Sequence, residues 1–206
     1  MAAKGKKKAK RSVVVTWFGH SAMLFESSAG KRVLIDPWLD NPKAPANSRE
    51  IADVDLILIS HGHGDHIGNT IELARRMNAG VVAIHEVALY LKSKGITAVH
   101  GMNKGGTITM GGVVVTMVDA KHSSDIDVES PPIPGGQAAG FVIRFEDGCT
   151  VYHAGDTSLF GDMRFIRSLY KPDVACIPIG DLYTMGPREA AMACALLLPK
   201  HILGLH

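Results

Sequence analysis

Residues 57–69 read ILISHGHGDHIGN and place three histidines and one aspartate within six positions, directly behind an apolar run. Charged imidazoles repel one another and neutral ones need hydrogen-bond partners, so crowding them is costly unless a bound group holds them. The apolar run, within residues 53–60, is typical of a buried strand. The chain must therefore fold so that this strand delivers His61, His63, Asp65 and His66 to one rigid place.

Other predicted strands end in the same way. Four of them stop at a histidine or an aspartate, namely the strands before Asp36, His122, Asp156 and His206. One polar residue at a strand end is common, but five such ends indicate strands that converge on one edge of a sheet sandwich. A rigid scaffold places binding and catalytic residues at such an edge.

The rest of the chain past residue 11 alternates short β-rich runs with a few helices. Strands are predicted over residues 12–19, 21–27, 31–37, 53–60, 80–85, 172–180 and 201–206, and hairpins over 106–120 and 136–156. Helices are predicted over 69–79, with Asn69 as a candidate N-cap, over 86–95, and over 186–200, with Pro187 in the first turn. A length of 206 residues suffices for one domain with a sizeable core.

The first eleven residues are different in composition. They hold six lysines and arginines without an acidic residue, while the whole chain carries a net charge of +2, so the remainder carries −4. We expect a disordered, solubilising basic tail over residues 1–11, and the acidic remainder argues against a nucleic-acid partner. The apolar run after the tail is too short for a signal peptide, and no run approaches the ~20 residues of a membrane span.

The cysteines are typical of a protein from a reducing compartment. There are three, an odd number, widely spaced at Cys149, Cys176 and Cys194, and they match no zinc-ribbon pattern. We therefore expect a cytoplasmic protein.

The spacing within the histidine cluster is suited to metal ions. His61 and His63 alternate by two, so both can reach one metal, while Asp65 and His66 lie beyond a bend toward a second metal nearby. The glycines between them permit that bend. Nitrogen and oxygen ligands without thiolate suit Zn²⁺ or Mn²⁺, with Fe²⁺ and Ni²⁺ as alternatives.

The motif HGHGDH, followed by AKHSS, HAGDT and a final LH, resembles the metallo-β-lactamase superfamily over nearly the whole chain from Val13. The segments WFGHSAMLFE and IGDLYTMGPREAA resemble a branch of small metal-dependent hydrolases related to L-ascorbate-6-phosphate lactonases and, more distantly, to N-acylphosphatidylethanolamine phospholipase D. The resemblance implies an α/β (α+β) fold over residues 12–206: an αββα sandwich of two mixed sheets flanked by helices.

The resemblance also implies a role for each matching residue. It assigns His61, His63 and His122 to a first metal, Asp65, His66 and His206 to a second, Asp156 to a bridge between them, and Asp36 to a hydrogen bond behind the ligands. It implies a hydrolase that directs a metal-bound hydroxide at a small ester, lactone or phosphoester, with Asp65 or Asp156 orienting that hydroxide.

Other histidines have weaker patterns. His20 follows an apolar strand, and we interpret it as a substrate contact or proton carrier, against a buried, hydrogen-bonded histidine as the alternative. His153 favours a supporting or core role. His85, His100 and His201 have no companions and are predicted to be ordinary.

Two other functions remain open: a nucleic-acid-processing nuclease of the same fold and a non-catalytic metal-binding module. An oxidoreductase of the flavodiiron type would need a Glu in place of His63 and a flavin domain. The substrate, the native metal and a homo-oligomeric state are not specified by the sequence. Because relatives implied by the resemblance continue past the last histidine, we expect a truncated C-terminus and a weaker second metal site at His206.

Overall fold

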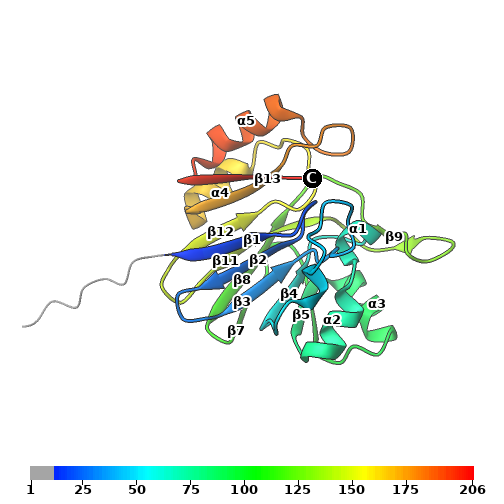
Figure 1. The fold of residues 1–206 in the computed structure, drawn as a ribbon. Helices are drawn as coiled ribbons and strands as arrows, with labels where there is room; N and C mark the ends of the chain where they lie inside the picture. The colour runs from blue at the N-terminus through cyan, green and yellow to red at the C-terminus, as the bar shows by residue number, and fades with distance from the viewer. Residues whose placement is uncertain (1–11) are drawn as a thin grey trace, which may run out of the picture.

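The computed structural model describes residues 12–206, in which two six-stranded sheets pack face to face (Figure 1). The predicted tail, residues 1–11, lies outside the described residues. The first sheet has the order of its numbering and contains β1 (Val13–Trp17), β2 (Met23–Ser27), β3 (Arg32–Ile35), β4 (Leu56–Ile59), β5 (Gly80–Ile84) and β6 (Val99–Met102). Pairing is antiparallel from β1 to β3 and parallel from β3 to β6, so the sheet is mixed.

The second sheet has the order β14-β13-β12-β11-β8-β7. Its strands are β7 (Thr107–Met110), β8 (Val113–Asp119), β11 (Ala139–Arg144), β12 (Thr150–His153), β13 (Val174–Pro178) and β14 (His201–Leu205). It is antiparallel from β7 to β12 and parallel from β12 to β14. A separate ribbon pairs β9 (Asp125–Ile126) with β10 (Ile133–Pro134).

Helices cover the outer face of each sheet (Figure 1). They are α1 (Gly64–Ile67), α2 (Thr70–Met77), α3 (His85–Ser93), α4 (Met163–Tyr170) and α5 (Pro187–Leu197), with one 3₁₀ turn, η1 (Ser48–Glu50). On β12, Val151 packs in the core between the sheets while Tyr152 packs under α4 and α5. Successive side chains of β12 therefore pack on opposite faces of the sheet, one against the other sheet and one against the helices. This arrangement confirms the predicted αββα sandwich.

Strand direction explains where the site lies. Within three residues, the carboxyl ends of β3, β4, β8, β12 and β14 lead into Asp36, His61, His122, Asp156 and His206. Because β1 runs antiparallel to β2, and β2 antiparallel to β3, the end of β1 reaches the same edge and places His20 there. Gly111 and Gly112 form the predicted hairpin turn with φ values of 56° and 91°, which suit glycine.

The structure differs from the sequence prediction at one helix cap and in several additional elements. Asn69 occupies the N-cap position of α2, but its side chain binds the Leu39 amide and Asp40 instead of capping the helix. The elements η1, α1, β6, β9, β10 and α4 are additional. Among them, β6 is a half-exposed edge strand, and the helical pattern of α4 is obscured because apolar Phe165 and Leu169 lie on its exposed side. Within residues 12–206, no helix combines the length and apolarity that a membrane crossing requires.

Candidate metal centre

Three histidines form a first group of candidate ligands. His61, His63 and His122 each offer a ligand atom, and these atoms lie within 4.8 Å of one another. The His61 Nε2 atom is 3.0 Å from His63 Nδ1, and the His122 ring lies 5.0 Å from the ring of His61. His61 is fully buried at the end of β4, whereas His122 comes from the opposite sheet. The predicted first set of ligands is therefore brought together.

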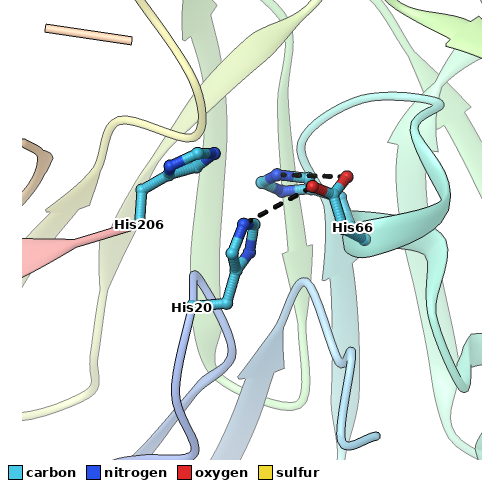
Figure 2. Close-up of side chains that lie close together, drawn as sticks. His20, His66 and His206 are labelled. Atoms are coloured by element: carbon cyan, nitrogen blue, oxygen red, sulfur yellow. Dashed lines mark ion pairs between the residues drawn. The ribbon is translucent and has the colours of Figure 1, made fainter. Parts of the chain in front are cut away.

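A second group lies beside the first. His20, Asp65, His66 and His206 offer ligand atoms that again lie within 4.8 Å of one another. The three histidine rings come from separate segments of the chain and point toward one another (Figure 2). His20 Nε2 is 3.4 Å from Asp65 Oδ2, and the rings of His20 and His206 are 4.3 Å apart. The structure thus places His20 beside the three residues predicted for the second metal.

Asp156 lies between the two groups. Its Oδ2 atom is 3.3 Å from His66 Nε2, 3.1 Å from His206 Nε2 and 3.8 Å from His122 Nε2. It also joins His61 and His66 in a third cluster of buried candidate ligands. One carboxylate therefore faces histidines of both groups, which is the position predicted for a bridging ligand.

A buried hydrogen-bond network supports the histidines from behind. Asp36 accepts the Ser60 amide at Oδ1, and at Oδ2 it accepts the Ser60 hydroxyl at 2.7 Å and His66 Nδ1 at 2.9 Å. The Ser60 hydroxyl is in turn 2.9 Å from His61 Nδ1. Because Ser60 donates its one proton to Asp36, it accepts from His61 Nδ1–H. Both rings then present Nε2 toward the site.

The ligand loop is held by a second contact. Ser124 Oγ accepts the Gly62 amide, and Asp127 accepts the Gly64 amide at 2.7 Å. A Cβ atom at position 62 would lie 2.7 Å from the Ser124 carbonyl oxygen, so glycine permits this close approach. The loop over residues 125–136 therefore contacts the histidine loop directly.

The electrostatics of the cluster are strongly perturbed. Burial lowers the pKa of His61 well below 6.5, and the neighbouring His66 adds to the effect. Burial opposes protonation of His66 too, but Asp156 and Asp36 outweigh it and raise its pKa well above 6.5. Burial, then the charges of His66 and His206, lower the pKa of His20 to about 4.

Asp156 stays ionised despite its burial. Burial would raise its pKa, but the neighbouring charge of His66, together with a hydrogen bond from His206, holds the pKa far below its usual range. A permanent carboxylate surrounded by imidazoles is the charge arrangement that a divalent cation requires of its ligands.

The donor set fits divalent ions. Among residues 12–206, the buried atoms His66 Nε2, Asp156 Oδ1 and His20 Nδ1 have no hydrogen-bond partner. Buried polar atoms without partners are costly, and a cation between them would satisfy the first two. His20 and Asp36 also have positive φ values of 50° and 45°, and such backbone strain is concentrated at functional sites.

The remaining histidines among residues 12–206 lie outside the candidate ligand groups. His153 is fully buried; its Nε2 contacts the Ser21 carbonyl at 3.2 Å and its Nδ1 accepts the Gly155 amide, so it supports the site without facing it. His85, His100 and His201 are exposed and belong to none of the candidate clusters found in residues 12–206. Sequence reasoning missed Ser60; its place directly before His61 was the available signal.

Known proteins are similar to this chain over most of its length. A model of the beta-lactamase superfamily domain matches residues 31–206. A "UPF0173 metal-dependent hydrolase" of Methanosarcina barkeri is 48% identical over 195 residues, which cover 94% of this chain and 83% of that protein. One of Koribacter versatilis, with the same description, is 45% identical over 193 residues, covering 93% and 83% of the two chains.

A solved structure agrees with these relatives. Igni18 from Ignicoccus hospitalis, described as a novel metallo hydrolase, superimposes with a TM-score of 0.84 at 39% identity, covering 94% of this chain and 82% of that one. The family model, the near-half identity of the relatives and the shared sandwich agree. The chain therefore belongs to the beta-lactamase superfamily and has its metallo-β-lactamase fold.

Proposed function

We propose that this protein is a metal-dependent hydrolase that acts on a small ester, lactone or phosphoester and holds two divalent ions, Zn²⁺ or Mn²⁺. The observation that carries the proposal is the position of Asp156, whose buried carboxylate faces both histidine groups. The names of the Methanosarcina and Koribacter relatives support the reaction class.

Each ion has its own set of ligands in this proposal. His61, His63 and His122 hold the first, Asp65, His66 and His206 hold the second, and Asp156 contacts both. Bound divalent ions would supply a water that loses its proton near neutral pH and would polarise the carbonyl or phosphoryl oxygen of the substrate.

The chain itself supplies orientation and proton handling. Asp65, with 38% of its side chain exposed, is the more open of the two central carboxylates, so its Oδ2 can accept a proton at the mouth of the site. His20 Nε2 lies 3.4 Å away and remains neutral at pH 7, since its pKa is about 4. A neutral imidazole there can donate a hydrogen bond to a substrate oxygen without adding charge.

The buried shell keeps these groups in place. Asp36 and Ser60 fix the rings of His66 and His61, and side chains locked in this way bind an ion without reorganisation. A non-catalytic metal-binding module would not need His20, which belongs to neither proposed ligand set and lies 3.4 Å from Asp65. The net charge of −4 outside residues 1–11 disfavours the nuclease.

A substrate panel tests the proposal. Protein loaded with Mn²⁺ or Zn²⁺ should hydrolyse at least one of 4-nitrophenyl acetate, a γ-lactone and bis(4-nitrophenyl) phosphate, and Asp156→Ala should abolish that activity. Exposed Leu169 lies on α4, so Leu169→Ala serves as the control that keeps activity. Fully loaded protein that hydrolyses none of the three would support the non-catalytic module instead.

A further inference from the structure

An apolar cleft opens beside the second ligand group. It has a volume of about 630 Å³, and its walls include Trp17, Trp38, Pro42 and Ile179. His20 and His206 line the same cleft, so its inner end is formed by two of the candidate ligands. A molecule lying in the cleft would therefore reach the candidate metal centre without crossing any other part of the protein.

The cleft is a built structure. The Trp17 indole donates to the His20 carbonyl at 2.9 Å, and the Trp38 ring meets the His20 ring edge to face at 5.1 Å. Asn41, which is 4% exposed, donates to the carbonyls of Phe18 and Trp38 and so ties the two walls together. Side chains fixed by such buried hydrogen bonds keep a cleft open.

The walls determine what the cleft can bind. The tryptophan, proline and isoleucine side chains gain free energy by covering an apolar group, and Trp17, now 53% exposed, gains most. Among the described residues that line the cleft, Lys43 is the only Lys, Arg, Asp or Glu. Small-molecule sites commonly combine apolar walls with a few convergent polar groups at one end, as here.

We propose that this cleft binds the apolar acyl group of the substrate, so that the bond to be cleaved lies at His20 and His206. This inference rests on the proposed hydrolase function and adds a substrate class to it: acyl esters whose chain is longer than acetyl. Continuity with the two histidines favours a substrate over a protein segment as the occupant.

The chain provides its own reporter, because Trp17 and Trp38 are its two tryptophans and both line the cleft. Tryptophan emission should therefore be recorded while metal-loaded protein is titrated with acetate, butanoate, hexanoate and octanoate below micellar concentrations. Acetate controls for binding of the carboxylate to the metals. We expect emission to move to shorter wavelengths, and affinity to rise about fourfold per added methylene until the cleft is filled.

Variants assign the response to the cleft. Trp17→Phe and Trp38→Phe should each remove part of the emission change, and Trp38→Ala should flatten the dependence on chain length. Leu169→Ala, an exposed apolar position on α4, should behave like the unaltered protein. The inference would be overturned if none of the four carboxylates changed the emission, or if the affinity did not depend on chain length. It would also be overturned if the emission spectrum depended on protein concentration, because a second copy of the chain would then cover the cleft.

Hydrolysis separates this inference from the function on which it rests. The value of kcat/KM should rise from 4-nitrophenyl acetate to the octanoate, and Trp38→Ala should reduce that rise. A fluorescence response that depends on chain length, without any turnover, would refute the proposed hydrolase function but support the acyl-binding cleft. Turnover that is equal for all chain lengths, without a fluorescence response, would refute the acyl site alone.

Discussion

Replacing Ser60 with alanine should weaken one metal site more than the other. The fully buried Ser60 hydroxyl donates to Asp36 and accepts from His61 Nδ1, whereas His66 reaches Asp36 directly. Ser60→Ala should therefore free the ring of His61, a candidate ligand of the first group, and leave the orientation of His66 intact. The predicted effect is selective loss of affinity at His61, His63 and His122.

The structure sets the magnitude. The variant leaves the buried His61 Nδ1–H without an acceptor, which costs about 1–3 kcal/mol. Removing a partner that orients a metal-bound histidine typically lowers metal affinity about 10–100-fold. That range corresponds to about 1.4–2.8 kcal/mol of metal-binding free energy.

Competition against a chromogenic chelator measures both Zn²⁺ affinities, and denaturant unfolding of metal-free protein measures stability. Ser27→Ala is the matched control, since Ser27 is also buried, accepts the Lys31 amide and donates to Glu146. It ends β2, whose first residue, Met23, pairs with Ile35 beside the site, so Ser27 lies at the opposite edge.

Both variants should lose stability, but only Ser60→Ala should lose affinity at the first site. Equal weakening of both sites, or unchanged affinities in Ser60→Ala, would refute the role assigned to this hydroxyl.

Three further predictions follow from the site. Asp156→Asn should reduce activity about 100-fold or more and lower the affinity for both metals. Metal analysis measures the occupancy, and full occupancy in this variant would contradict a bridging Asp156. A chelator should lower the melting temperature, because bound ions stabilise only the folded state, and an unchanged value would argue against resident metals. Metal-free protein should lose stability from pH 7 to 5, because burial lowers the pKa of His61 and His153, so the unfolded chain binds more protons below pH 6.5. His66, with its raised pKa, acts in the opposite direction. His153→Gln should reduce the slope by up to about 1.4 kcal/mol per pH unit, measured by denaturant unfolding, and an equal slope would be evidence against this assignment.

Sequence reasoning identified the candidate cluster because the signal for it is local: each residue lies at or just after a strand end. Strands that end in His or Asp can be read one at a time, and the sandwich then brings Asp36, His122 and Asp156 to one edge. The prediction missed what depends on tertiary contacts. The addition of His20 to the second group requires β1 and β14 to end side by side, which no periodicity encodes.

Other misses have the same origin. The Asn69 side chain satisfies the Leu39 amide in preference to its own helix, because that amide is buried and needs a partner. The apolar cleft joins Trp17, at the end of β1, to Ile179, which directly follows β13 of the other sheet, so it exists only in the folded chain.

Anomalous X-ray diffraction at the metal absorption edge tests the central claim most directly. Crystals of protein saturated with Zn²⁺ or Mn²⁺ should show two peaks, one among His61, His63 and His122 and one among Asp65, His66 and His206. For zinc, Asp156 should lie about 2.0–2.2 Å from both. A single peak, a peak outside these groups, or an Asp156 that contacts neither ion would contradict the account.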